Sequence, residues 1–469
     1  MTKKPAGMKA FIIIIIGQII SFLGSGMTNF AMAIWIFEQN QSATDFSLLA
    51  VAGFAPIIIF SPIAGVLVDR WNRKLVMMLS DLAAGFTTII MLILFATGSL
   101  EVWHLYVLGF ISGTFQAFQF PAFSASMSLM VPKEQYGRAA GLSSLSGPAA
   151  LIFSPILAAA LIHKIGVQGI MIIDIVSFVF AIGVLFFVFI PQPKKEEKAE
   201  GEEKEKSSIL KDSGFGFKYI FSRPSLLGLQ TMFFFINFVA SFGGILMVPM
   251  ILTLAQTNPE SSLGTIMTLG AVGGLAGGFI MSVWGGPKTK IHGVLLGVIF
   301  SSIFGPLLLG LGSIIGGSNS AVVFGFSGAV LIWAISSLIS NILLRILNGS
   351  SQAIWMAKVP PELQGRVFSI RLLIAQITVP FAMLISGPLA DNVLEPAMAK
   401  GGAYADFFGP IVGTGPGTGM ASVFVITGVL GIFVGLVPYL IPAIRNLDKI
   451  LPDHDEVQAK IENEPQPAE

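Results

Sequence analysis

Long uninterrupted apolar stretches constrain this chain more than any other feature of its sequence. Apolar runs recur from end to end and are separated by short breaks that contain charged residues, glycine or proline. An α-helix needs about 20 apolar residues to cross the hydrocarbon core of a bilayer, and these runs lack the period of two that marks transmembrane β-strands. The sequence therefore predicts an all-α membrane protein.

The composition supports this class and excludes several others. The chain has 469 residues, of which 54% are hydrophobic and 11% charged, whereas a soluble domain carries about 25% charged residues. The absence of cysteine excludes disulfides, thiolate metal sites and a catalytic thiol, and no G-x-x-x-x-G-K-[ST] motif for ATP is present. We expect no enzymatic activity, no metal, no cofactor and no nucleic-acid partner. The expected partners of a monomer are a small-molecule substrate and membrane lipid.

Breaks in the apolar pattern predict twelve transmembrane helices. Their expected spans are 11–37, 46–69, 75–97, 103–131, 138–162, 169–190, 226–252, 261–285, 291–312, 322–357, 366–390 and 420–443. The charge run KKEEKAEGEEKEK at 194–206 divides them six and six and is too polar to pack in a core. We expect an N-terminal bundle over 1–190, a charged linker over 191–225, a C-terminal bundle over 226–447 and a tail over 448–469. The linker is either a solvated tether or a docking segment.

Lysine and arginine predict the orientation in the membrane, because positive charge is enriched in cytoplasmic loops. One side holds most of these residues, and only Lys164 and Lys400 fall on the other. The residues on the rich side are Lys3, Lys4, Lys9, Arg70, Arg73, Lys74, Lys133, Arg138, Lys288, Lys290, Lys358, Arg366, Arg445 and Lys449. This distribution predicts a multi-pass protein of a plasma membrane, with both termini in the cytoplasm.

The two halves of the sequence repeat each other. VPKEQYGR at 131–138 recurs as VPPELQGR at 359–366, and GVLVDRW at 65–71 recurs as GFIMSVW at 278–284. Parallel repeats related by an axis along the membrane normal are one of the layouts of secondary transporters. The second copy carries Ser282 where the first has Asp69, so the repeat is asymmetric in charge.

Four predicted helices carry polar residues at helical spacing. They are the first helix of each predicted triplet. Their residues are Gln18, Phe22, Ser25 and Asn29; Ser112, Gln116, Gln119 and Phe123; Gln230, Asn237 and Ser241; and Ser337, Asn341, Arg345, Asn348 and Gln352. Polar groups in a membrane span face a cavity or a partner. These residues therefore predict a substrate cavity for a bulky, partly apolar ligand, the alternative being hydrogen bonds between packed helices.

A few ionisable residues inside or at the ends of helices are candidates for proton coupling: Asp81, Asp174, Glu38 and Arg345. Arg345 has Asp174 and Glu38 at compatible depths, which favours a structural ion pair over a proton-linked switch. Asp81 either carries a transported proton or pairs with Arg138 or Arg73.

The turn GVLVDRWNRK at 65–74 resembles the signature of the major facilitator superfamily, a family of membrane transporters, through Gly65, Asp69, Arg70, Arg73 and Lys74. The resemblance implies two six-helix bundles around a central cavity lined by the four polar stripes. It also implies that Asp69 meets the N-terminus of the helix at Gly365 and Arg366, while Arg70 reaches Glu134. We call the Asp69 contact the inner latch; its alternative is a simple topology signal.

Further segments resemble the macrolide-efflux branch of bacterial drug exporters. They are GFAPIIIFSPIAGVLVDRWNRK at 53–74, FQFPAFSASMSLMVPKEQ at 118–135 and GRVFSI at 365–370. Gly147-Pro148 resembles the core of the superfamily's antiporter motif, or is a kink that shapes packing. The resemblance implies proton-driven export of amphipathic compounds by alternating access. The alternatives are a siderophore or metabolite exporter with Arg345 binding an anionic group, and a receptor or lipid scramblase without coupled transport.

Overall fold

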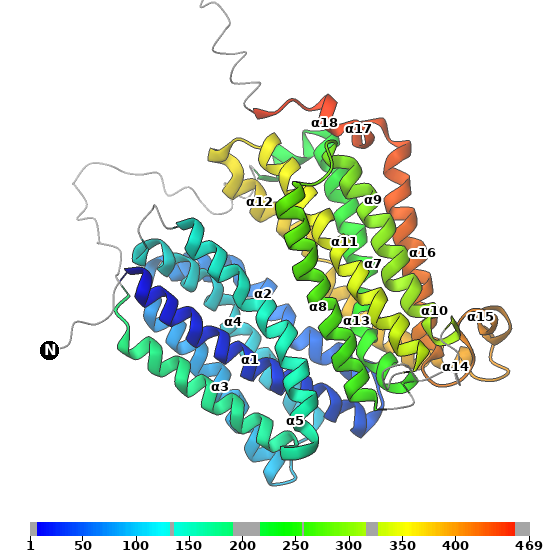
Figure 1. The fold of residues 1–469 in the computed structure, drawn as a ribbon, viewed down its shortest axis with the longest axis horizontal. Coiled ribbons are helices and arrows are strands. Elements are labelled where there is room, and N and C mark those ends of the chain that lie inside the picture. The colour runs from blue at the N-terminus through cyan, green and yellow to red at the C-terminus, as the bar shows by residue number, and fades with distance from the viewer. Residues whose placement is uncertain (1–6, 132–135, 191–215, 256–257, 316–326, 455–469) are drawn as a thin grey trace, which may run out of the picture.

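The computed structural model describes residues 7–131, 136–190, 216–255, 258–315 and 327–454, and within these ranges it contains helices and no strands. A backbone in a bilayer must satisfy its hydrogen bonds within its own helix, which explains why so apolar a chain is helical. The helices form two bundles, here named the N-half and the C-half, which lie side by side in Figure 1. The predicted all-α membrane fold is confirmed.

In the described ranges, the N-half consists of five helices, the last of which is bent. They are α1 Gly7–Asn40, α2 Ala43–Arg70, α3 Arg73–Ala96, α4 Val102–Met130 and α5 Tyr136–Phe187. α5 folds back on itself at Gly166, where φ is 67°, in the left-handed region that glycine enters most readily. Its two arms correspond to the predicted spans 138–162 and 169–190.

The C-half contains more helical segments because proline and glycine interrupt its helices. The bounds are α7 Pro224–Leu254, α8 Pro259–Trp284, α9 Lys290–Ser302, η2 Ile303–Leu307, α10 Leu308–Ile315, α11 Gly328–Lys358, α12 Pro361–Gln376, α13 Val379–Leu389, η3 Ala390–Leu394, α14 Glu395–Met398, α15 Ala405–Val412, α16 Thr418–Leu440, α17 Pro442–Arg445 and α18 Leu447–Ile450. The π-helical turns η2 and η3 contain or follow Pro306 and Pro388, which remove a backbone donor from the helix.

Ten helices in the described ranges are long and apolar enough to cross a membrane. The segment Phe153–Phe187 is counted once although it bends at Gly166. The structure is therefore compatible with the twelve predicted spans. The Gly-rich segment at 401–419 includes the helix α15, whose Val412 is buried.

The two halves share a core at one end only. Met27 and Ala158 of the N-half belong to the same buried cluster as Leu246 and Leu263 of the C-half. At the opposite end, each half has its own cluster, Ala10 to Ile190 in one and Tyr219 to Leu447 in the other. We name these the far end and the linker end. The halves pack together at the far end and diverge toward the linker end (Figure 1).

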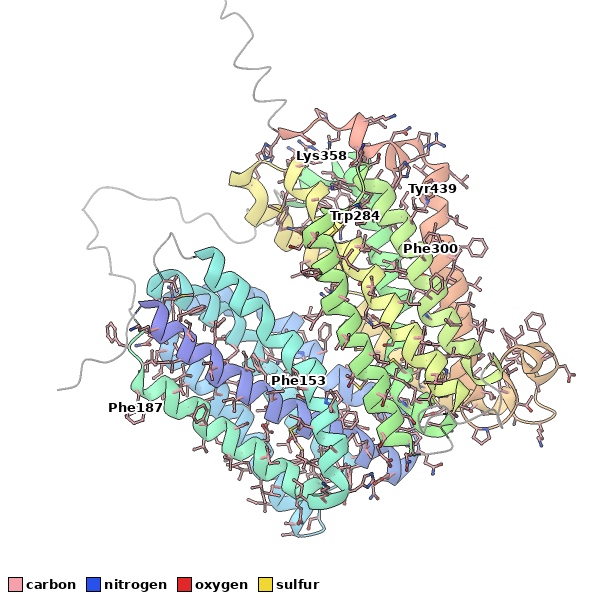
Figure 2. The ribbon with its side chains drawn as sticks, viewed as in Figure 1. Phe153, Phe187, Trp284, Phe300, Lys358 and Tyr439 are labelled. Carbon is pink, nitrogen blue, oxygen red and sulfur yellow. The ribbon has the colours of Figure 1, made fainter. Side chains whose placement is uncertain are left out.

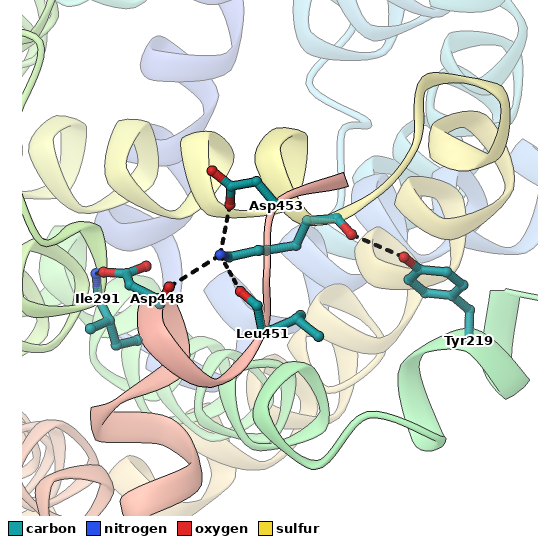
Figure 3. A network of polar contacts seen from close by, with 6 residues as sticks. Tyr219, Ile291, Asp448, Leu451 and Asp453 are labelled. Carbon is teal, nitrogen blue, oxygen red and sulfur yellow. Dashed lines mark hydrogen bonds and ion pairs between the residues drawn. The ribbon is translucent and has the colours of Figure 1, made fainter. Parts of the chain in front are cut away.

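A buried lysine at the linker end of α11 holds the end of the described chain. Lys358 Nζ donates to the carbonyl oxygens of Asp448, at 3.3 Å, and Leu451, and forms an ion pair with Asp453 at 2.7 Å. The Tyr219 hydroxyl donates to the Lys358 carbonyl oxygen at 3.0 Å. Figure 3 shows this network. Lys358 thus ties two segments to the end of α11. One contains Tyr219, at the start of the C-half, and the other is 448–453, the first part of the predicted tail.

Large apolar side chains cover the outside of the bundles. Phe187 is 70% exposed and Phe300 42% exposed, and both lie on the surface in Figure 2. A soluble monomer rarely exposes extended apolar surface. This surface matches a lipid environment, as expected for a multi-pass membrane protein.

Candidate functional site

The N-half encloses a cavity of about 500 Å³ between α1, α2, α3 and α4. This volume falls within the roughly 300–1,000 Å³ typical of small-molecule sites. Ile245 and Met383 of the C-half also line it. The predicted stripe residues that line it are Phe22, Ser25, Asn29, Ser112, Gln116 and Gln119.

Asp81 is one of two carboxylates in this cavity. It is buried on α3, and its two oxygens accept hydrogen bonds from Gln18 Nε2 at 3.0 Å and Gln119 Nε2 at 2.9 Å. Gln119 Nε2 also donates to Gln18 Oε1 at 3.0 Å. Three helices therefore meet at one carboxylate through neutral amides, which satisfy its hydrogen bonds without neutralising its charge.

Asp174 is the second carboxylate and comes from the returning arm of α5. It accepts hydrogen bonds from Ser25 Oγ at 3.0 Å and Thr88 Oγ1 at 2.9 Å. Gly24 permits this approach, since a Cβ atom there would lie 2.9 Å from the Asp174 Cα. No lysine, arginine or histidine lines the cavity within the described ranges.

The predicted partner of Asp174 lies elsewhere. Arg345 is exposed on α11 and packs beside Gly274 and Gly277 of α8, and no ion pair joins it to Asp174 or Glu38 among the described residues. Glu38 is exposed at the end of α1. The expected pair fails because hydroxyl groups of the N-half already satisfy Asp174. Of the four proton-coupling candidates, the cavity brings together Asp81 and Asp174.

A second cavity of about 400 Å³ lies in the C-half. Predicted stripe residues line it: Gln230, Asn237, Asn348 and Gln352. Other stripe residues have packing roles and line neither cavity. Ser337 and Asn341 meet Gly270 of α8, Ser241 donates to the Asn237 carbonyl oxygen of its own helix, and Phe123 stacks on Phe11 with ring centroids 5.8 Å apart.

Arg371 of α12 also lines the C-half cavity and was not among the predicted site residues. Its guanidinium donates to Gln352 Oε1 at 2.8 Å and Ser351 Oγ at 3.1 Å, and lies 5.2 Å from the centroid of the Trp355 ring. The signal that could have identified it is the same one that singled out Arg345, a cation inside an apolar helix. The sequence does not reveal which of the two faces a cavity.

Asp391 joins the two halves at the far end. Its carboxylate accepts hydrogen bonds from Ser42 Oγ at 3.0 Å, Ala43 N at 3.1 Å, Thr44 N at 2.8 Å and Thr44 Oγ1 at 2.7 Å. One turn earlier, Gly387 lies so close to α2 that a Cβ atom would be 2.6 Å from the Thr44 Cα. A C-half carboxylate therefore occupies the N-terminus of an N-half helix, which attracts negative charge. We call this contact the outer latch.

Most residues of the predicted inner latch and of the neighbouring gating motifs lie outside the side chains that the structure describes. Glu134 lies outside the described ranges, and so do the side chains of Gly65, Asp69, Arg70, Arg138, Gly147, Pro148, Gly365 and Arg366, although their helices are described. Lys74 Nζ donates to the carbonyl oxygens of Phe186 at 3.1 Å and Val188 at 2.7 Å, and Arg73 is half-buried at the start of α3. The inner latch therefore stays a prediction.

Comparisons with known proteins agree with this architecture. Macrolide efflux protein A of Streptococcus pyogenes is 26% identical over 389 residues, covering 80% of this chain and 88% of that protein. The transporter YfiS of Bacillus subtilis is 26% identical over 93% of this chain and 94% of its own length. A bacterial homologue of the lysosomal transporter Spinster, solved in an inward-facing conformation, superposes with a TM-score of 0.66 at 15% identity, covering 93% of this chain and 96% of that one.

The family model described as Major Facilitator Superfamily matches residues 14–383, which confirms the resemblance that the turn at 65–74 indicated. The chain belongs to the Major Facilitator Superfamily of membrane transporters.

Proposed function

We propose that this protein is a secondary efflux transporter that exports amphipathic, macrolide-type compounds in exchange for protons. One observation carries the proposal: Asp81 and Asp174 share an N-half cavity of about 500 Å³ in which every described hydrogen-bond donor to them is neutral. A carboxylate in such a setting can exchange a proton for a bound substrate without breaking an ion pair. The similarity to macrolide efflux protein A of Streptococcus pyogenes supports the substrate class.

Two latches at opposite ends of the molecule would provide alternating access. The outer latch uses Asp391, in the turn η3 that follows α13, to cap the start of α2. The inner latch would use Asp69, at the end of α2, to cap the start of α12. Each contact requires one end of the molecule to be closed. The halves share a buried core at the far end and have separate cores at the linker end, which supports assigning this conformation to the state open toward the linker end.

The linker end is the cytoplasmic end in this proposal. The segments at 70–74, 288–290 and 358–366 lie there and together carry seven lysine and arginine residues, and such positive charge favours the cytoplasmic side. The protein then lies in the bacterial plasma membrane as a monomer, with both termini inside the cell.

Inside-out membrane vesicles test the transport step. We expect a radiolabelled macrolide to accumulate when a pH gradient is imposed and to stop accumulating when nigericin collapses it. Asp81→Asn and Asp174→Asn should each lower the accumulation to that of vesicles without the protein. Asp406→Asn removes an exposed carboxylate of α15 and serves as the matched control. Accumulation that continues unchanged without the gradient contradicts proton exchange.

A further inference from the structure

The two cavities carry opposite charge. Carboxylates line the N-half cavity, whereas the charged side chain of the C-half cavity is Arg371, and no aspartate or glutamate lines that cavity within the described ranges. Apolar side chains, including Phe233, Leu344 and Phe368, form much of the remaining wall. A cation with an apolar surround suits a ligand with an anionic group and an apolar body.

Arg371 has donors to spare. A guanidinium carries five N–H donors. Those that have partners among the described residues bond to Gln352 and Ser351, both neutral. No ion pair joins Arg371 to a carboxylate among the described residues. An arginine keeps its charge, and a charge within a membrane protein normally has a partner or a ligand.

A second polar group in the same cavity is also unsatisfied. Gln230 of α7 is 1% exposed, and its Nε2 donates to the Arg371 carbonyl oxygen at 2.9 Å. Its Oε1 is buried without a hydrogen-bond partner in the described structure. An unpaired buried acceptor is unfavourable by about 1–3 kcal/mol, and a hydroxyl or N–H group elsewhere on a bound ligand would satisfy it.

We propose that the C-half cavity is a second binding site, which holds the carboxylate or another anionic group of an amphipathic ligand at Arg371. The guanidinium supplies the charge and the hydrogen bonds, and the Trp355 ring beneath it, 5.2 Å away, keeps it in place. This site is separate from the N-half cavity, and ligand binding to it requires neither transport nor a proton gradient. Arg371, and not the predicted Arg345, recognises the anion.

A pair of probes that differ only in charge tests the proposal in purified protein. Dansylglycine carries a carboxylate, and dansylglycinamide replaces it with a neutral amide. Binding to the full chain in phosphatidylcholine nanodiscs is followed through dansyl emission excited by tryptophan, since Trp355 adjoins the site. We expect the carboxylate probe to bind about tenfold more tightly than the amide, because a hydrogen bond to a charged group is stronger than a neutral one.

Arg371→Gln should abolish this preference, whereas Arg345→Gln, a matched arginine outside the cavity, should preserve it. Two results overturn the proposal: the wild-type chain binds both probes equally, or Arg371→Gln weakens both probes by the same factor, as expected of a purely structural arginine. Because the wild type alone gives the first result, a variant that fails to fold does not prevent the test. Nanodiscs with added phosphatidylglycerol distinguish the source of the anion: competition for the carboxylate probe assigns the site to a lipid headgroup, and its absence to a soluble compound.

Discussion

Replacing Asp391 with asparagine should open the far end of the molecule. The carboxylate accepts four hydrogen bonds, at 2.7 to 3.1 Å, from residues 42–44 at the start of α2. An amide keeps one acceptor oxygen and loses the charge that the N-terminus of the helix attracts. Hydrogen bonds to a charged group contribute roughly 1.5–3 kcal/mol, and a charge at a helix end contributes about 0.3–1 kcal/mol.

The carboxylate is partly exposed, so solvent reduces these contributions. We therefore expect Asp391→Asn to destabilise the state that is closed at the far end by about 2 kcal/mol. This corresponds to an approximately 30-fold change in the ratio of the two conformations. A population of about ten to one in favour of far-end closure would become about one to three.

Spin-label distance measurements check this expectation, and the chain is well suited to them because it has no native cysteine. Labels at Ser99 and Lys400, on opposite halves at the far end, report far-end opening; labels at Phe189 and Lys288 report the linker end. Asp391→Asn should lengthen the first distance and shorten the second. Asp45→Asn is the matched control, because Asp45 also lies at the start of α2.

The Asp45 carboxylate bonds within the N-half, to Asn40 at 2.7 Å and Tyr106 at 2.7 Å. Asp45→Asn should therefore change the free energy of both conformations by the same amount. If the Asp391→Asn and Asp45→Asn variants give the same distance distributions, the outer latch does not bias the conformation and the reasoning is refuted. Gly387→Ala should act in the same direction as Asp391→Asn, because its Cβ atom would overlap α2.

Other perturbations have expected outcomes as well. Asp69→Asn should shift the same spin-label distances in the opposite direction, by favouring opening at the linker end; an unchanged linker-end distance would exclude the inner latch. Gly273→Ala should lower the melting temperature in detergent, since its Cβ would overlap the backbone of α11 at a penalty of about 1–3 kcal/mol, while Gly278→Ala, which faces open space, should not. Lys358→Met should speed amide hydrogen exchange in residues 447–453, which the lysine binds through backbone oxygens and Asp453; unchanged exchange would show that other contacts hold this segment.

The architecture was largely predictable from the sequence because the membrane leaves few options to an apolar chain. Runs of sufficient length, breaks at charged residues and a repeated motif were enough to indicate helices in two related halves. Helical spacing also identified several cavity residues, such as Gln116 and Gln119, since periodicity reveals which residues share one face of a helix.

Periodicity does not reveal which helix lies opposite that face, and here only the tertiary structure decided. It placed Arg345 against the glycines of α8 and Arg371 in a cavity, although both are cations within apolar helices. It gave Asp174 hydroxyl partners in place of the expected arginine. It also joined Asp391 to Ser42, which lies 349 residues away in the sequence. Local spacing determined the elements of this protein, whereas the partners of its charged residues depended on contacts between distant helices.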